Sequence, residues 1–387
     1  MKLLVINDAG VYGGGAENRI RLLLEELQKN KALEEIHILQ AGPFKNLATK
    51  KFVFHSVVPG YISSYRATAR IIRQAKIDIV QVHNLQGLLA TPILAAKRLG
   101  VPVIWVAHDY WPLCAYRSFV NPSRADKFVS CKQVGIKKCI HCVGLKGYLR
   151  QTFFKKVVNC SNIAVVPGKI AKEFCQRHGL LFKKLKIIAP WIALDEFYSS
   201  TMPKISDNIV FVGSLLPYKG AWVAAEALKY IKNDFPSVVI RFIGPNQEKD
   251  NVYRKKIEEI GKRDGTLENM LFLGCKDWAQ LKIEYGQGGI FIFPSVCEEL
   301  FGLAWAEAMA AGVPVITSDS GGLPEFVINN GYLVKQRQSE ELASAVIALL
   351  KDKDRAFSLA KNSREYALNA WKVDRAANQF IDIYQKL

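Results

Sequence analysis

The sequence lacks any apolar run of the roughly 18 residues that a membrane-spanning helix needs. It also lacks low-complexity tracts and short-period repeats. Half of the chain is apolar and 23% is charged, which is typical of an ordinary globular protein. The first apolar stretch is short and meets Asp8, so it predicts a β-strand and not a cleaved signal peptide. We therefore expect a cytoplasmic protein, and its 387 residues favour two domains.

Acidic residues are scarce in the first half of the chain. Residues 1–190 contain 30 Lys and Arg against 10 Asp and Glu, a balance of +20, whereas residues 191–387 contain 23 against 25, a balance of −2. Such asymmetry indicates an anionic partner, namely nucleic acid, a phosphorylated substrate or anionic lipid, or else a basic surface that favours solubility. Nucleic acid is disfavoured because no recognised binding module or interleaved aromatic surface appears.

The eight cysteines predict no disulfide framework, because thiols stay reduced in the cytoplasm. Four of them fall within 29 residues and end in a C-x2-C spacing: Cys114, Cys131, Cys139 and Cys142. That spacing suits a structural zinc ion. Free thiols in a basic loop are the alternative.

Short apolar segments alternate with longer amphipathic ones along the whole chain, which predicts βαβ units and parallel sheets. Helices are expected at Gly220–Lys232, at Glu340–Lys351 and over the last residues from about Asp374. The predicted strands are Lys2–Asn7, Glu35–Gln40, Phe52–Val57, Asp78–Val82, Val103–Ala107, Asn162–Val166, Asn208–Val212, Val238–Ile243, Met270–Leu273, Ile290–Phe293, Val313–Thr317 and Tyr332–Val334.

The charge change and a turn around Pro190 place a domain boundary near residues 188–200. The predicted fold class is α/β, with two doubly wound, Rossmann-like domains that face one another across a cleft. In such sheets ligands bind at the carboxyl ends of the strands, so the loops after the strands are the places to look for chemistry.

The segment from Pro294 to Val315 predicts a strand end, a loop, a helix and a turn. Gly302 permits close backbone approach, and the helix that it opens offers unpaired N–H groups and a dipole suited to a diphosphate. Glu299 lies in the loop, and Glu307 lies roughly 7–8 Å along the helix axis. These two carboxylates could hold opposite ends of a nucleotide sugar; the alternative is an amphipathic helix with a solvated Glu.

This segment resembles the retaining glycosyltransferases of family 4, which have the GT-B fold. Glu299 and Glu307 match the E-x7-E pattern of the family, in register with Pro294, Ser295, Phe301, Gly302, Gly312 and Pro314. The resemblance implies that Glu299 touches the donor sugar and Glu307 the ribose hydroxyls. It also implies that Phe301, Gly302 and Leu303 bind the donor.

Two neighbouring loops resemble the same family. G-S-L-L-P-Y-K-G, beginning at Gly213, is similar to G-R-L-x3-K-G and places Lys219 as a point charge for phosphate. Ser214 stands where the family has arginine, so a bidentate phosphate donor is missing. The sequence D-S-G-G-L-P-E resembles the G-G-x-P-E loop, which implies that Gly321 and Gly322 line the sugar pocket with exposed N–H groups.

The first half offers a glycine loop and two histidines. Gly13, Gly14 and Gly15 follow the first strand and resemble the family's G-G-A-E loop, which reaches the donor phosphates; a plain turn is the alternative. His108 ends a strand, and the resemblance implies that it approaches the donor sugar.

Two polar side chains accompany His108 at these strand ends. Asp109 follows it directly, and the resemblance implies that this carboxyl orients nearby groups. His83 ends the preceding strand and is either an acceptor contact or a structural residue.

Taken together, the resemblance implies transfer with retention from a UDP-, GDP- or dTDP-sugar to a glycan or lipid-linked acceptor, in cell-surface polysaccharide or lipopolysaccharide synthesis. No metal is expected to take part, because no D-x-D motif lies at a strand end. Residues 1–190, with a cysteine-bearing insertion at 110–150, would bind the acceptor, 191–373 the nucleotide sugar, and 374–387 would pack back on the first domain.

Arg66 and Arg70 form a basic stripe with Arg73 and are expected to contact the acceptor. The basic first half predicts a peripheral enzyme on anionic lipid at the inner face of the cell membrane. Two other classes stay open: a different GT-B enzyme, such as an epimerase or inverting transferase, and a catalytically weak sugar-nucleotide-binding protein.

Overall fold

The computed structural model describes residues 1–9, 15–42, 52–120, 131, 135–245 and 248–387. These residues form two compact units. The chain passes from the first unit to the second between Trp191 and Ile192 and returns for its last helix at Val373.

The first unit is built on a seven-stranded sheet with the order β3-β2-β1-β4-β5-β6-β7. Every neighbouring pair is parallel. Its central strands are apolar and buried along almost their whole length, as expected for a sheet covered by helices on both faces. The strands are β1 Lys2–Ile6, β2 Glu35–Ala41, β3 Val53–Val57, β4 Ile79–Val82, β5 Val103–Val106, β6 Ile163–Val166 and β7 Leu185–Ile187.

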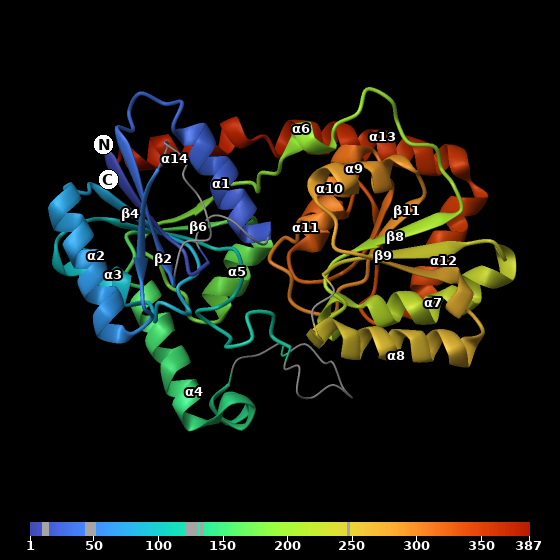
Figure 1. Ribbon diagram of the computed structural model, residues 1–387, viewed down its shortest axis with the longest axis horizontal. Helices are drawn as coiled ribbons and strands as arrows, with labels where there is room; N and C mark the ends of the chain where they lie inside the picture. The colour runs from blue at the N-terminus through green and yellow to red at the C-terminus, as the bar shows by residue number, and fades with distance from the viewer. Residues whose placement is uncertain (10–14, 43–51, 121–130, 132–134, 246–247) are drawn as a thin grey trace. The chain divides into compact units, whose positions relative to one another are not determined.

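Helices cover both faces of this sheet (Figure 1). The first and last helices pack side by side, and Phe380 and Tyr384 join Val5 and Leu23 in one core. The helices are α1 Gly15–Leu27, α2 Tyr61–Ala75, α3 Thr91–Arg98, α4 Ile136–Val158, α5 Lys169–Arg177 and α14 Val373–Tyr384. Residues 373–387 are therefore part of the first unit.

The second unit has a six-stranded parallel sheet with the order β10-β9-β8-β11-β12-β13. Gly220, Gly244 and the glycines that follow β12 mark places where loops at the carboxyl edge approach one another closely. The strands are β8 Asn208–Val212, β9 Val239–Ile243, β10 Met270–Gly274, β11 Ile290–Phe293, β12 Val315–Ser318 and β13 Tyr332–Val334.

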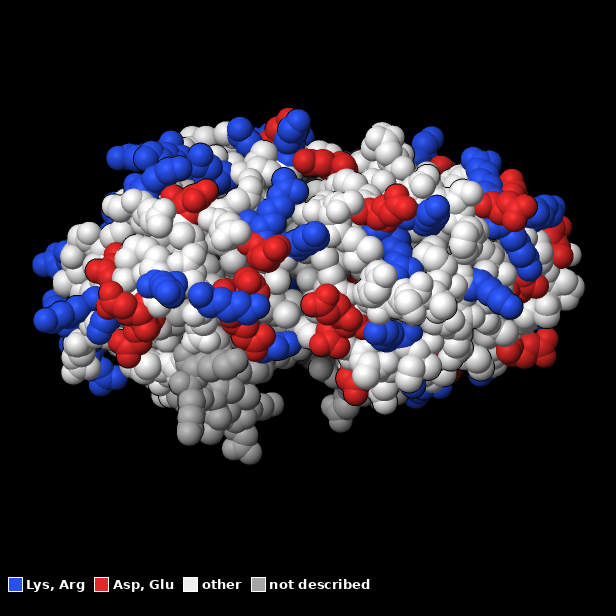
Figure 2. All heavy atoms as spheres, turned by 90° about the horizontal axis from the view of Figure 1, so that it is seen from above, with Lys and Arg blue, Asp and Glu red and all other residues white. Residues whose placement is uncertain are grey.

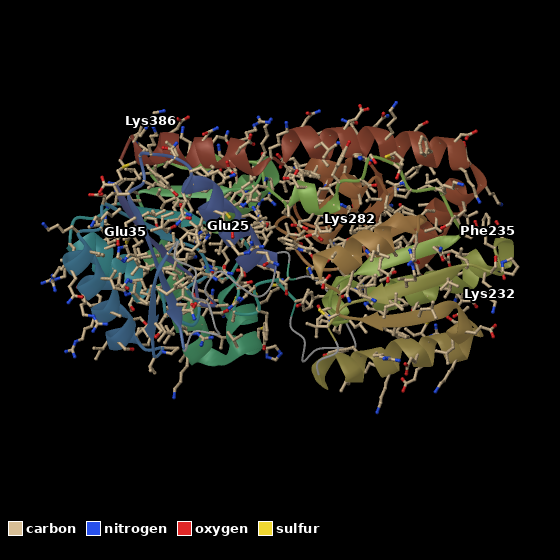
Figure 3. All side chains as sticks on the ribbon, turned by 45° about the horizontal axis from the view of Figure 1, so that its top comes forward. Glu25, Glu35, Lys232, Phe235, Lys282 and Lys386 are labelled. Carbon is tan, nitrogen blue, oxygen red and sulfur yellow. The ribbon has the colours of Figure 1, made fainter. Side chains whose placement is uncertain are left out.

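The helices of the second unit pack in two groups, with α7 beside α8 and α12, and α10 beside α9 and α13. Lys232 and Phe235 mark the carboxyl end of α7 in Figure 3, where Lys232 donates to Glu268 Oε1 at 2.9 Å, away from the carboxyl ends of the strands. The helices are α6 Leu194–Phe197, α7 Ala221–Asp234, α8 Glu248–Asp264, α9 Trp278–Gly286, α10 Ala304–Ala311, α11 Leu323–Val327, α12 Ser339–Lys351 and α13 Lys353–Ala370, with short 3-10 turns at Pro217–Lys219 and Leu267–Asn269.

All twelve predicted strands are confirmed, with ends that differ by at most two residues. The three predicted helices correspond to α7, α12 and α14. Strand β7 was not predicted, because it is a three-residue edge strand whose side chains are mostly exposed and which contains Lys186.

No helix among the described residues is long and apolar enough to cross a membrane. Figure 2 shows acidic side chains interspersed with basic ones on the face that it displays. The positive excess of the first half therefore forms no uniform basic field on that face.

Candidate active site

Each sheet has one place where the order of its strands reverses: between β1 and β4 in the first unit, and between β8 and β11 in the second. Loops after such strands diverge to opposite faces and leave room for a ligand at the carboxyl edge. His83 follows β4 and His108 follows β5, whereas Lys219 follows β8 and Glu299 follows β11. These four predicted residues thus lie at the carboxyl edges of the two sheets.

In the second unit, Lys219 and Glu299 meet directly. The ammonium of Lys219 donates to Glu299 Oε1 at 2.6 Å, although 80 residues separate them in sequence. The same oxygen lies 2.8 Å from the Ser295 hydroxyl and 3.4 Å from the Cys297 sulfur. The ammonium also lies over the Phe293 ring, 5.4 Å from its centroid. No role for Cys297 is predicted from the sequence, where its only signal is its place inside the motif.

Burial and ion pairing shift the pKa values of Lys219 and Glu299 in opposite directions. Burial alone would lower the pKa of Lys219, but the Glu299 carboxylate more than offsets it and holds this pKa above its ordinary value. Burial likewise opposes ionisation of Glu299, yet Lys219 and the Ser295 hydroxyl bring the pKa of that carboxyl below its usual range. Both groups are therefore charged at neutral pH.

The loop that contains Glu299 is held in place by close contacts with the backbone of neighbouring segments. Gly220 has φ 75°, and a Cβ there would lie 1.8 Å from the carbonyl oxygen of Pro294. A Cβ on Gly321 would lie 2.1 Å from the Glu299 carbonyl oxygen, and the Gly322 N–H donates to that oxygen at 2.8 Å. The prediction that Gly322 exposes its N–H to a ligand is corrected: both glycines allow the loop at residues 319–322 to pack against Glu299.

Glu307 is the fourth residue of α10, which begins at Ala304 with Leu303 at its N-cap. The predicted helix start at Gly302 is therefore two residues early. Gly302 has φ 71°, and a Cβ there would lie 3.2 Å from the Phe293 ring. Burial raises the pKa of Glu307 to about 7, so this carboxyl is ready to change its ionisation near neutral pH.

Two predicted donor contacts have structural roles instead. Phe301 is 2% exposed and packs in an aromatic cluster, so its ring is not available to a ligand; its ring partners are Trp305, Phe326 and Trp371. The Gly213 N–H donates to the Ile243 carbonyl at 2.9 Å and extends the sheet. Ser214 lies next along the chain, near enough for its hydroxyl to oppose slightly the rise that burial causes in the pKa of the Tyr218 phenol.

In the first unit, Asp8 organises the loop after β4. Its carboxylate accepts hydrogen bonds from the Gly87 N–H at 2.7 Å and the Leu88 N–H at 3.0 Å. Burial raises the pKa of Asp8, against these N–H donors and the nearby Arg117. Asp8 follows the first predicted strand, and no role is predicted for it from the sequence.

His83 and His108 are in direct contact. Nδ1 of His83 lies 2.7 Å from Nε2 of His108. Burial lowers the pKa of His83 to about 3, and burial together with His83 holds the pKa of His108 well below its ordinary value. Both imidazoles are neutral.

Asp109 directly follows His108 on the loop after β5. It accepts from the Trp111 N–H at 2.8 Å, and burial raises its pKa to about 6. The guanidinium of Arg117 lies 3.7 Å from its other oxygen.

The remaining predicted contacts are not brought to these strand ends. Arg66 and Arg70 lie on the exposed face of α2, where they line a shallow hollow of about 310 Å³ with Tyr65 and Arg73. Gly15 begins α1, and Gly14 lies outside the described residues.

The four clustered cysteines are near enough to influence one another's ionisation. Burial raises the pKa of Cys114 to about 11, opposed by backbone N–H groups of Tyr116 and Phe119, while Cys142 and Cys131 add to the rise. In the part of the chain that the structure describes, no three His, Cys, Asp or Glu side chains are arranged to hold a metal ion.

Comparison with known proteins assigns this architecture. The model of glycosyl transferases group 1 matches residues 197–366, and that of Glycosyltransferase Family 4 matches residues 13–196. The chain belongs to glycosyltransferase family 4. Its GT-B fold is confirmed by HepE of Anabaena in complex with UDP and glucose, which superimposes with a TM-score of 0.76 and 18% identity over 100% of both chains.

The family 4 relatives differ in how much of the chain they match. A GDP-mannose-dependent alpha-(1-6)-phosphatidylinositol monomannoside mannosyltransferase of Mycobacterium tuberculosis is 29% identical over 45% of this chain and 46% of its own length. An uncharacterized glycosyltransferase of Methanocaldococcus jannaschii is 24% identical over 95% of this chain and 93% of its own. The match to the first of these spans about half of that relative.

Replacing the buried carboxyl of this family 4 protein by an amide, Glu307→Gln, should stabilise it at high pH. Because the folded pKa of about 7 exceeds the ordinary 4.5, folding holds this proton, and wild-type stability falls as pH rises from about 4.5 to 7. We expect the variant to have the higher Tm at pH 8 and a difference that shrinks toward pH 5. The exposed Glu365→Gln serves as the control, and equal Tm profiles for wild type and Glu307→Gln would contradict the assignment.

Proposed function

We propose that this protein transfers a sugar from a nucleotide-sugar donor to a glycan or lipid-linked acceptor, with retention of anomeric configuration, in cell-surface polysaccharide or lipopolysaccharide synthesis. The observation that carries the proposal is the Lys219–Glu299 pair at the β8/β11 reversal. In the free protein the lysine ammonium and the carboxylate pair with each other. Together they suit a ligand that has an anionic group for the ammonium and hydroxyl groups for the carboxylate.

Binding of a nucleotide sugar would separate the Lys219 ammonium from the Glu299 carboxylate. Diphosphate oxygens would take the Lys219 ammonium, which frees Glu299 Oε1 to accept from sugar hydroxyls, while Glu307 at the start of α10 would accept from the ribose. The leaving diphosphate would help to deprotonate the acceptor hydroxyl. The protein's part is then positioning and stabilisation of the leaving group's charge, with no covalent intermediate and no metal ion.

The names of two similar proteins point to different donor bases. The HepE complex contains UDP and glucose, and the mycobacterial relative is named as GDP-mannose-dependent. We propose a UDP-, GDP- or dTDP-sugar, to be identified by a thermal-shift screen.

Substitution of Lys219 tests the proposal. Lys219→Met should abolish donor-dependent transfer and should cost about 3–5 kcal/mol of stability, because it leaves the buried Glu299 carboxylate without its counter-charge. The double variant Lys219→Met/Glu299→Gln should recover much of the Tm without recovering transfer. Chromatographic detection of product and thermal melts give both readouts.

Three results would count against the proposal. Transfer at wild-type rate by the double variant would remove the pair from the reaction. A product of inverted configuration by NMR would favour an inverting GT-B enzyme. Donor binding without turnover by wild type would favour a binding protein.

We propose further that a basic and apolar surface docks on anionic lipid. It consists of the exposed residues Val58, Ile62, Ile136, Leu145, Lys146, Leu149 and Arg150. The Tyr61 ring contacts the Phe153 ring at 5.9 Å, so the start of α2 lies beside α4. Neither helix contains an acidic residue. Exposed apolar side chains among cations are the features that interfacial membrane binding uses.

Vesicle co-sedimentation tests this surface. Ile62→Ser/Leu145→Ser/Leu149→Ser should weaken binding to vesicles that contain phosphatidylglycerol, because it removes the apolar groups that enter the interface. Leu271→Ser/Ile283→Ser, which removes exposed apolar side chains of the second unit, should leave binding unchanged. Wild-type binding that is independent of anionic lipid would overturn the proposal.

The cysteines Cys114, Cys131, Cys139 and Cys142 are proposed to hold a structural zinc ion, with thiolates as ligands. The C-x2-C spacing of Cys139 and Cys142 supports this, and binding would require the thiols to draw together, because the described residues do not form a three-ligand group. Elemental analysis should find one zinc per chain, lost in Cys139→Ser/Cys142→Ser and kept in Cys160→Ser, an exposed cysteine elsewhere. Active protein without zinc would dismiss the site.

A further inference from the structure

A chain of buried hydrogen bonds leads from the last helix to His108. The Tyr384 hydroxyl on α14 donates to Gln81 Oε1 at 2.6 Å. Gln81 Nε2 lies 3.0 Å from Nε2 of His83, and Nδ1 of His83 lies 2.7 Å from Nε2 of His108. Gln81, His83 and Tyr384 are each at most 2% exposed, so water does not compete with these bonds.

The direction of the chain follows from its first bond. An amide that accepts through its oxygen must donate through its nitrogen, so Gln81 Nε2 donates to Nε2 of His83. A neutral imidazole has one N–H, and His83 therefore donates from Nδ1 to Nε2 of His108. A phenol is a better donor than acceptor, and an amide oxygen is a good acceptor, which favours this direction over the reverse.

The chain ends in a buried atom that is left without a partner. His108 Nδ1 has no hydrogen-bond partner among the described residues, although it is shielded from solvent. Burial, reinforced by the cation of Arg19, keeps both imidazoles neutral. Because Nε2 of His108 accepts, its single proton sits on Nδ1. A buried donor without an acceptor costs free energy unless a ligand completes it.

We propose that Tyr384, Gln81 and His83 are positioning residues that lock His108 in the Nδ1–H tautomer, so that it presents a hydrogen-bond donor to an oxygen atom of the bound substrate. The locked residue is a neutral donor and not a base. The last element of the chain, α14, thereby controls the protonation of a residue at the end of β5. The substrate's identity rests on the proposed function, whereas the tautomer is a property of the free protein.

Histidine-selective ¹⁵N NMR on the free wild-type protein at pH 7 measures the tautomer without any substrate. We expect His108 to show a protonated Nδ1 and an unprotonated Nε2. The resonance is assigned by its loss in His108→Gln. A protonated Nε2 with a bare Nδ1, or an imidazolium, would overturn the proposal.

Tyr384→Phe tests the origin of the lock. Without the hydroxyl, the Gln81 amide is free to turn, and we expect the His108 signals to become a mixture of both tautomers. Gln81→Met should do the same. Tyr285→Phe, which removes an equally buried hydroxyl in the second unit, should leave them unchanged. A pure Nδ1–H tautomer in both Tyr384→Phe and Gln81→Met would show that the chain does not set it.

The same variants separate positioning from general stability once transfer is measurable. Tyr384→Phe should lower kcat/KM by about tenfold, the equivalent of one hydrogen bond, with a melting curve that stays cooperative. If wild type shows no transfer at all, the proposed function fails while the NMR result still decides the tautomer.

Discussion

Parallel pairing is the constraint on which both sites depend. Every pairing in the two sheets is parallel, so all strands of a sheet end at the same edge. Residues as distant as Lys219 and Glu299 become neighbours only because β8 and β11 lie side by side at the point where the winding reverses. Two antiparallel neighbours would have placed these side chains at opposite edges. The glycines at the loops then permit contacts that a Cβ would forbid, which is why the edge is so closely packed.

The side chains at the two places where the strand order reverses differ in charge state: those of the second unit are charged, and the histidines of the first unit are neutral. In the second unit, burial is offset by direct pairing, and Lys219 and Glu299 stay charged. In the first unit, burial prevails: His83 and His108 lose their charge and Asp109 is pushed toward neutrality. A ligand's charge can replace one partner of an ion pair, whereas neutral side chains linked by hydrogen bonds can only donate or accept further hydrogen bonds. The second unit is therefore suited to an anion and the first to polar, uncharged groups.

Strand positions and the main motif could be predicted from the sequence, because buried parallel strands are continuous apolar runs and Glu299 and Glu307 have a fixed spacing. What could not be predicted depends on contacts between distant residues. Phe301 belongs to the motif but packs in an aromatic cluster with Trp371, which is seventy residues further along the chain. Arg66 and Arg70 share a helical stripe, yet that stripe faces solvent. Gln81 and Tyr384 carry no local signal, because only the return of α14 to the first unit joins them.

Ser214, in place of an arginine, leaves Lys219 as the cation of this loop that could bind phosphate. An arginine there would hold phosphate through two parallel bonds even while Lys219 stayed paired. Ser214 instead offers a hydroxyl and no cation. In the proposed donor complex, phosphate would have to compete with Glu299 for the ammonium itself, across a 2.6 Å contact. Release of Glu299 would thereby be tied to arrival of the diphosphate, and the carboxylate would become free for sugar hydroxyls only with the anion in place. The absence of an arginine at position 214 would weaken binding of a bare diphosphate but would make binding of the two parts of the donor interdependent.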